Sequence, residues 1–168
     1  KMMDQGTSHP QSRPLLGFGA AAPWGESWFS EAKAERLIRS ALENGITHFD
    51  TAGFYCSGEA EPRLGRILSR AVAEGVTTWD RLTISTKVGK KIAKTGGLVR
   101  DFQPAAIEAS LDAATAAFGG KPLDIVYLHG PNKHELISSL SVLKRHKDQG
   151  RIKASGVCTD ATQLMHVA

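Results

Sequence analysis

Runs of strand-forming apolar residues alternate with stretches of helical periodicity along this chain, and this alternation constrains the fold more than any other feature. Strands are expected at 15–21, 46–50, 82–87, 123–129 and 152–157. Helices are expected at 30–44, 62–75, 104–118 and 135–149, with a further helix from about Asp160. Strict alternation of strand and helix predicts a parallel sheet with right-handed crossovers and helices outside it. The chain is therefore expected to be an α/β protein built from five such units.

Two parallel α/β architectures fit this order of elements. The strand ends at Asp50, Lys87, His129 and Cys158 recur at a spacing close to the roughly 31 residues per unit of an eight-unit barrel. A doubly wound sheet can share that spacing, but its usual GxGxxG fingerprint is missing from 16–24. The sequence therefore favours a partial (β/α)8 TIM-barrel type of fold.

Length and composition indicate one globular domain. The chain has 168 residues, of which 41% are hydrophobic, enough to bury one sizeable core. Residues 1–14 are polar and contain glycine and proline, so we interpret them as a loose leader before a domain at 15–168. No apolar run approaches the roughly 18 residues of a membrane span. Two isolated cysteines, Cys56 and Cys158, fit a reducing compartment, and a cytoplasmic protein is expected.

The charge pattern argues against nucleic acid and membrane surfaces as partners. The net charge is +4, and basic residues are interspersed with acids instead of forming a stripe with aromatics. One local basic excess has two interpretations, a solvated loop or a surface beside an anionic cofactor or substrate; it comprises Lys87, Lys90, Lys91, Lys94 and Arg100. No histidine has a metal-site spacing with Asp, Glu or Cys, so no metal is proposed.

Four ionisable side chains follow or end the predicted strands. Asp50 ends the second strand and Tyr55 lies in the loop just beyond it. Lys87 ends the third strand and His129 the fourth. Because the carboxyl ends of parallel strands meet at one face, these side chains are expected to face one pocket. Taken singly, each of the four residues also has a purely structural interpretation. These are a turn cap for Asp50, an aromatic packed on the barrel rim for Tyr55, a solvated lysine for Lys87 and a hydrogen-bonded core residue for His129.

The four groups together suit proton delivery to a carbonyl oxygen. A phenol releases its proton reluctantly at neutral pH, and a nearby ammonium favours the phenolate. Lys87 is expected to act on Tyr55 in this way, with Asp50 keeping the ammonium charged and fixed. Carbonyl reduction also needs a hydride, which no side chain here supplies, so a nicotinamide cofactor is expected.

Three spaced motifs make the chain similar to a known family. Residues 50–55 read DTAGFY and match a DTAxxY motif, residues 85–87 read STK and match a strand ending in TK, and residues 128–131 read LHGP and match LHxP. In this order, each at a strand end, they resemble the aldo-keto reductases, and the similarity runs from about Leu15 to Ala168.

The resemblance implies roles for particular residues. Tyr55 resembles the proton donor, with Asp50, Lys87 and His129 completing a catalytic tetrad. The implied cofactor is NADP or NAD, with NADP favoured. Cofactor contacts are expected at Gly19, Ala20, Asp50, Cys158 and Thr159. The implied reaction interconverts an aldehyde, ketone or sugar hemiacetal with an alcohol or lactone.

The chain departs from the family pattern beside the site. Residues 55–65 are two residues longer than the family's YGxSExxLG run, and 156–159 read GVCT where the family has GVSN. Trp24 and Trp28 follow the first strand, where they either wall a substrate pocket or simply pack. Cys56, beside the expected donor, is either redox-sensitive or an inert thiol.

The five units fall short of the eight that close a barrel. An open parallel barrel leaves edge strands and apolar side chains in water, so either further units come from another chain or a longer parent, or the sequence is incomplete. Alternatively, the five units close differently and the site is not catalytic. The rival hypothesis is therefore a non-catalytic, half-length relative that acts as a binding or assembly subunit, an oligomer or a completing chain for a partner's barrel.

Overall fold

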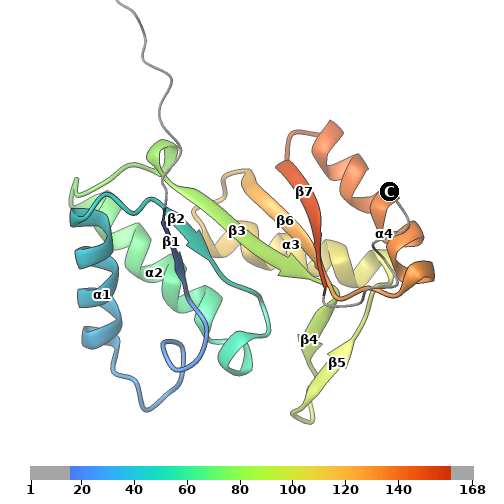
Figure 1. The fold of residues 1–168 in the computed structure, drawn as a ribbon, viewed down its shortest axis with the longest axis horizontal. Coiled ribbons are helices and arrows are strands. Elements are labelled where there is room, and N and C mark those ends of the chain that lie inside the picture. The colour runs from blue at the N-terminus through green and yellow to red at the C-terminus, as the bar shows by residue number, and fades with distance from the viewer. Residues whose placement is uncertain (1–15, 160–168) are drawn as a thin grey trace, which may run out of the picture.

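The computed structural model describes residues 16–159 as an open, five-stranded parallel sheet with helices packed on it (Figure 1). The strands lie in the order in which they occur along the chain, β1-β2-β3-β6-β7. Their bounds are β1 Gly17–Gly19, β2 His48–Asp50, β3 Thr83–Val88, β6 Leu123–His129 and β7 Ile152–Cys158. Sequential parallel strands joined by crossover helices form part of a (β/α) barrel. This confirms the predicted fold class.

Four helices connect these strands, and α2 and α3 lie behind the sheet in Figure 1. Their bounds are α1 Glu31–Glu43, α2 Ala60–Ala73, α3 Pro104–Ala117 and α4 Lys133–Asp148. Ser30 caps α1, since its Oγ accepts a hydrogen bond from the Lys33 N–H. The α4 helix begins earlier than predicted because Asn132 and Glu135 form a capping box.

The buried face of α4 includes only part of the apolar residues that recur there at helical spacing. Leu136 and Leu143 are buried, but Ile137 and Leu140 are exposed. Ser139 and His146, which are polar, occupy part of the buried face. Helical spacing identified the helix, whereas the side facing the sheet was set by tertiary packing.

The sequence suggested that the glycine- and lysine-rich segment after β3 is a loop, but the structure differs. It forms an antiparallel hairpin of β4 (Lys90–Ile92) and β5 (Leu98–Arg100), which projects from the sheet in Figure 1. Gln103 is the N-cap residue of α3, and its N–H donates to the Asp101 carboxylate. Asp101 also pairs with Lys91, which lowers the pKa of its carboxyl group.

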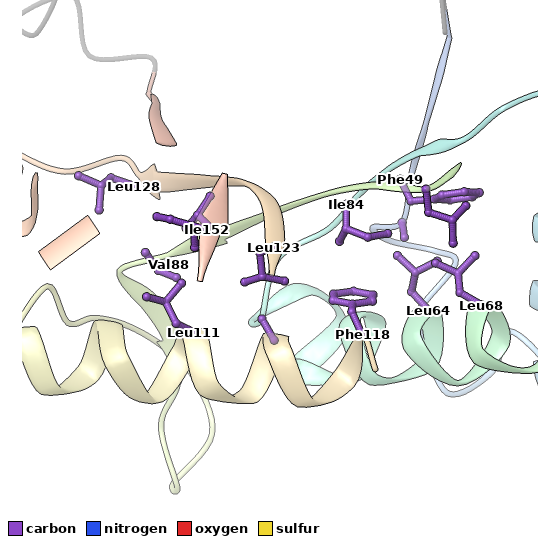
Figure 2. Close-up of a cluster of buried hydrophobic side chains, with 14 of the residues drawn as sticks. Phe49, Leu64, Leu68, Ile84, Val88, Leu111, Phe118, Leu123, Leu128 and Ile152 are labelled. Atoms are coloured by element: carbon purple, nitrogen blue, oxygen red, sulfur yellow. The ribbon is translucent and has the colours of Figure 1, made fainter. Parts of the chain in front are cut away.

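The core fills the space between the sheet and α2 and α3. Figure 2 shows Phe49 and Ile84 from the strands facing Leu64 and Leu68 of α2, with Phe118 from the end of α3 beside them. The two helices pack very closely. A Cβ on Gly65 would lie 2.1 Å from the carbonyl oxygen of Ala117, so only glycine fits at that crossing.

Two predictions fall outside the part of the chain that the structure describes. They are the leader at 1–14 and the helix expected from Asp160. Among the helices within residues 16–159, none is long and apolar enough to cross a bilayer. The same residues contain no cluster of three or more His, Cys, Asp or Glu side chains able to hold a metal ion.

Candidate active site

The register of the sheet places the candidate residues of the strands in three successive layers on the face opposite α2 and α3. Asp50 of β2 pairs with Ser85 of β3, and Lys87, two residues further along, pairs with Tyr127 of β6. His129 lies at the end of β6 on the same face as Tyr127, because side chains alternate along a strand. The carboxyl ends of three strands therefore bring three of the four predicted residues together.

The central contact is an ion pair between Lys87 and Asp50. Lys87 Nζ donates to Asp50 Oδ2 at 2.6 Å and to the carbonyl oxygen of Thr51 at 2.8 Å. Lys87 is only 8% exposed, so these two acceptors replace most of the water that an ammonium normally binds. The group is held in one position at the end of β3.

Asp50 is itself held by a chain of polar side chains. Ser85 Oγ donates to Asp50 Oδ1 at 2.7 Å, and His48 Nε2 lies 3.0 Å from the same Ser85 oxygen. Both carboxylate oxygens of Asp50 are thus engaged, one by a hydroxyl and one by an ammonium. This arrangement orients the carboxylate toward Lys87.

Tyr55 is carried to the site by the turn after β2. Its N–H donates to the carbonyl oxygen of Ala52 at 3.0 Å, and the 3-10 turn η1 (Tyr55–Gly58) follows. Lys87 Nζ lies 4.9 Å from the centre of the Tyr55 ring. The predicted neighbourhood of this phenol and ammonium is therefore observed, and the cation lies within the range of attraction to the ring.

His129 packs against two aromatic rings of the same turn. Its ring centre lies 5.1 Å from that of Phe54 and 6.1 Å from that of Tyr55. Burial, with smaller effects of Lys90 and Lys87, lowers the pKa of His129 to about 4. The imidazole is neutral at neutral pH.

The neutral imidazole of His129 carries one proton, and its surroundings favour one tautomer. Nδ1 is buried without a hydrogen-bond partner among the described residues. A buried N–H without an acceptor is unfavourable, so the proton belongs on Nε2, which then serves as a donor.

The two-residue extension beyond Tyr55 is accommodated by a left-handed backbone. Cys56, Ser57 and Gly58 have φ values of 54°, 58° and 94°. Cys56 packs on the loop after β1, where a Cβ at Gly25 would lie 2.7 Å from its sulfur. Burial raises the pKa of the Cys56 thiol, which favours the inert interpretation over a reactive thiolate.

The loop after β1 is fastened to α2 by a single guanidinium. Arg63 donates to the carbonyl oxygens of Trp24 at 2.7 Å, Phe29 at 3.0 Å and Glu26 at 3.3 Å. Its Nε lies 3.2 Å from Glu31 Oε2 at the start of α1. Arg63 thus fixes the loop that borders the Tyr55 turn.

The two tryptophans predicted to line a substrate pocket have different environments. Trp24 is 4% exposed and packs edge-to-face on Phe18 in the core, as in the packing alternative. Trp28 is 72% exposed on the same loop. The structure does not bring Trp24 together with the four ionisable residues.

The predicted cofactor contacts lie at the two edges of the sheet. Cys158 ends β7 beside His129, and its carbonyl oxygen accepts from the Gly130 N–H at 2.7 Å. Thr159 follows it. At the opposite edge Gly19 is exposed, with no atom within 4 Å of a Cβ built there.

Ala20 is more enclosed than the other predicted cofactor contacts. It is fully buried, and its N–H donates to the carbonyl oxygen of Asp50 at 2.7 Å. The hydroxyl of Thr51 donates to the carbonyl oxygen of Ala20 at 3.3 Å. Ala20 therefore supports the turn that carries Asp50 and Thr51.

The residues present fit the reactive end of a nicotinamide cofactor. A hydroxyl and a thiol at 158–159 are polar groups of the kind that bind a carboxamide, although a thiol binds weakly. Gly19 leaves open space at one edge of this face, since no atom lies within 4 Å of a Cβ built there, whereas the Tyr127 ring lies against Gly156. No contact with a cofactor phosphate can be assigned to the described residues.

Sequence reasoning missed several residues of the site. Ser85 shares a face with Lys87 at the i, i+2 spacing of a strand, so alternation was a usable signal. Phe54 and the carbonyl of Thr51 gave no comparable signal. Glu61 at the start of α2 was also missed; it is 5% exposed and accepts from Thr86 Oγ1 at 2.5 Å.

Comparisons with known proteins agree with this geometry. D-threo-aldose 1-dehydrogenase from Pseudomonas sp. is 28% identical over 169 residues, covering 86% of this chain and 49% of the relative. An aldo-keto reductase from Bacillus halodurans in its holo form has a TM-score of 0.76 at 24% identity, over 89% of this chain and 47% of that one. An aldo-keto reductase complexed with NADPH has a TM-score of 0.67 at 27% identity, over 86% and 44%.

The extent of these matches is consistent across the comparisons. The chain spans about half the length of the curated relatives that it matches. The model of the aldo/keto reductase family matches residues 15–168, which is nearly the whole sequence. The chain therefore belongs to the aldo/keto reductase family.

Proposed function

We propose that this chain carries the proton-transfer half of a nicotinamide-dependent oxidoreductase site. The reaction interconverts an aldehyde, ketone or sugar hemiacetal with the corresponding alcohol or lactone. The observation that carries the proposal is the Lys87 ammonium, held by Asp50 and Thr51 and 4.9 Å from the Tyr55 ring. The name of one relative, D-threo-aldose 1-dehydrogenase, favours a sugar among the possible substrates.

Tyr55 is the proton donor in the reduction direction. As the carbonyl carbon is reduced, its oxygen becomes an alkoxide and takes the phenolic proton. The phenolate that remains is stabilised by the Lys87 ammonium, and Asp50 keeps that ammonium in place. In the oxidation direction the same phenolate accepts the proton of the alcohol.

His129 orients the reacting oxygen. Since its pKa is lowered to about 4, the ring is neutral and offers one N–H donor beside Tyr55. A neutral donor holds the oxygen without competing with Tyr55 to protonate it. His129 therefore orients the reacting oxygen, and Tyr55 transfers the proton.

Cys158 and Thr159 are the residues that would hold the nicotinamide carboxamide, with Gly19, Ala20 and Asp50 on the opposite side. When bound, the cofactor supplies the hydride. NADP is favoured over NAD, and the NADPH complex of one structural relative supports that choice.

The test compares the two tyrosines of the chain, Tyr55 and Tyr127. Nicotinamide absorbance is followed with a panel of small carbonyls and sugars. Tyr55→Phe is expected to reduce kcat by at least about 100-fold, because general acid catalysis contributes about that much or more. Tyr127→Phe, which removes a hydroxyl from the same sheet face, is expected to stay within about threefold. Equal rates for wild type and Tyr55→Phe would remove Tyr55 from the mechanism.

A binding or assembly role is the second candidate, and the open sheet favours it. Among the described residues, β1 and β7 each pair on one side only, and Leu16 and Val157 at these edges are exposed. Native mass spectrometry with and without NADPH separates the candidates. Association without cofactor binding supports assembly, whereas a monomer that binds NADPH contradicts it.

A further inference from the structure

Glu61 is a buried carboxyl group that the proposed mechanism does not use. It lies in the first turn of α2 and is 5% exposed. Its Oε1 accepts a 2.5 Å hydrogen bond from Thr86, the neighbour of Lys87 in β3. Among the described residues, Thr86 is the only hydrogen-bond partner of the Glu61 side chain, and Thr86 belongs to β3, the strand that carries Lys87.

Glu61 and Lys87 line the same cavity. It has a volume of about 370 Å³ and lies between α2, α3 and the start of the β4–β5 hairpin. Water in this cavity can reach the carboxyl group from the helix side of the sheet, whereas Tyr55 and His129 do not line it. The cavity gives Glu61 a route for proton exchange that does not pass through the substrate site.

The charged groups around Glu61 are nearly all basic. Lys87 lines the cavity from the end of β3, and Lys90 and Lys91 line it from β4. The lining residues of α3 are alanines and Ser110, with no ionisable side chain. Lys91 is neutralised by Asp101 and Lys87 is paired with Asp50, so Lys90 is the lining lysine without a carboxylate partner among residues 16–159.

Glu61 changes its charge near neutral pH. Burial raises the pKa of its carboxyl group to about 7, and the Thr86 hydrogen bond and the charge of Lys87 offset part of that effect. When Glu61 is ionised, its negative charge cancels part of the positive potential that Lys87 creates at Tyr55. When Glu61 is neutral, the full positive potential stabilises the Tyr55 phenolate.

We propose that Glu61 is a positioning residue that acts through Lys87, so that its loss of charge strengthens the stabilisation of the Tyr55 phenolate and its gain of charge weakens it. The proposal rests on the function proposed for Tyr55 and adds a pH-dependent control from outside the substrate site. No residue other than Glu61 changes its protonation in this step. Its proton is exchanged with water in the cavity.

The coupling between Glu61 and Lys87 is tested without any enzymatic assay. The 15N signal of the Lys87 ammonium group, identified by its loss in Lys87→Met, is followed from pH 5.5 to 8.5. In the wild type the signal is expected to shift in one step centred near pH 7. The step is expected to vanish in Glu61→Gln and to persist in Glu59→Gln, which removes an exposed carboxylate two residues away.

A second variant tests the same coupling while keeping the carboxyl group. Thr86→Val removes the hydrogen bond that favours ionised Glu61, so the step is expected at higher pH. A step unchanged in both Glu61→Gln and Thr86→Val would overturn the proposal, because another group would then be titrating. This readout stands even if Tyr55→Phe shows that Tyr55 has no catalytic role.

The effect on Tyr55 is tested by the pH dependence of carbonyl reduction. In the wild type kcat is expected to fall by at least about threefold from pH 6 to 8 as Glu61 ionises, and to stay flat in Glu61→Gln. A purely structural role would lower kcat equally at every pH. A parallel fall in both proteins, with the Lys87 signal coupled as expected, would show that Glu61 does not act on the Tyr55 step.

Discussion

Lys87 and Asp50 form an ion pair of 2.6 Å whose members differ in exposure, with 7% of the Lys87 side chain and 39% of the Asp50 side chain accessible. A charge that loses its partner is costly only where water cannot replace the partner. The two halves of this pair are therefore expected to respond differently to removal.

Asp50→Asn is expected to destabilise the protein more than Lys87→Met. Asp50→Asn leaves a buried ammonium without a counter-charge. Lys87→Met leaves the Asp50 carboxylate, to which water and Ser85 can still donate hydrogen bonds. The difference in unfolding free energy is expected to be about 2 kcal/mol, below that of a fully buried pair because Asp50 is partly exposed. Urea denaturation at pH 7 measures it, and equal losses would contradict the asymmetry.

Glu61→Gln is expected to be progressively more stable than the wild type as the pH rises from 4.5 to above 7. The pKa of Glu61 is about 7 in the folded chain and 4.5 as the reference value, so the native state holds the extra proton in this window. Wild-type stability therefore falls with rising pH, by on the order of 3 kcal/mol over the window.

Denaturant titrations of wild type, Glu61→Gln and Glu59→Gln at several pH values give this comparison. Glu59 is exposed at the start of the same helix and serves as the matched control. A constant stability gap between wild type and Glu61→Gln would show that the carboxyl group is ionised throughout the range.

His129 is expected to stay neutral well below pH 6.5. Because its pKa is lowered from 6.5 to about 4, the unfolded chain binds the extra proton between these values. This contribution to stability is present above pH 6.5 and is lost as the pH falls toward 4. The carbon-13 shifts of the His129 ring should be flat from pH 8 to 5.5. A His129 transition near pH 6.5 would contradict its burial.

Ser57→Gly is expected to stabilise the turn after Tyr55. Ser57 has a φ of 58°, a conformation that costs a non-glycine residue about 1 kcal/mol. Its side chain is exposed and makes no hydrogen bond within the described residues, so little is lost. Thermal unfolding should show a gain of up to about 1 kcal/mol. Gly58→Ala, at a φ of 94°, should show a loss and serves as the opposite control.

Arg63→Lys is expected to loosen the loop after β1. Nη1 of Arg63 donates to all three carbonyl oxygens while Nε pairs with Glu31, and the single nitrogen of a shorter lysine side chain cannot serve both sites, so the expected loss of stability is about 2–3 kcal/mol. Arg66→Lys changes an exposed arginine of the same helix and should cost less than about 0.5 kcal/mol. Tryptophan fluorescence, to which Trp24 contributes together with Trp28 and Trp79, should shift to the red only in Arg63→Lys. An unchanged spectrum in Arg63→Lys would argue against the proposed role of Arg63 in fixing the loop after β1.

Most of the fold was predictable because its elements are marked locally. Ser30 caps the start of α1, and Asn44 and a left-handed Gly45 end it, which are residue types that mark helix ends. The apolar runs at 82–87 and 123–129 became adjacent strands of the sheet. The positions of Asp50 and Lys87 followed from the rule that parallel strands end at one face.

Other features depend on contacts that no local pattern encodes. The hairpin β4–β5 is short and mostly exposed, so it lacks an apolar alternation; its turn at Gly96 and Gly97 was the only signal. The pairing of Glu61 with Thr86 arises only when α2 packs on β3. Trp24 is buried against Phe18 while its carbonyl oxygen accepts from Arg63 of α2, contacts that form only in the folded chain.

The pairing of β3 with its neighbours ties the assembly of the sheet to that of the polar cluster. If β3 slipped by one residue, Thr86 or Val88 would take the layer of Lys87, and the ammonium would point among the leucines of α2 and α3. An unpaired cation there is prohibitively unfavourable. The same charge that equips the cluster for chemistry therefore also disfavours, during folding, every alignment of β3 that is shifted by an odd number of residues.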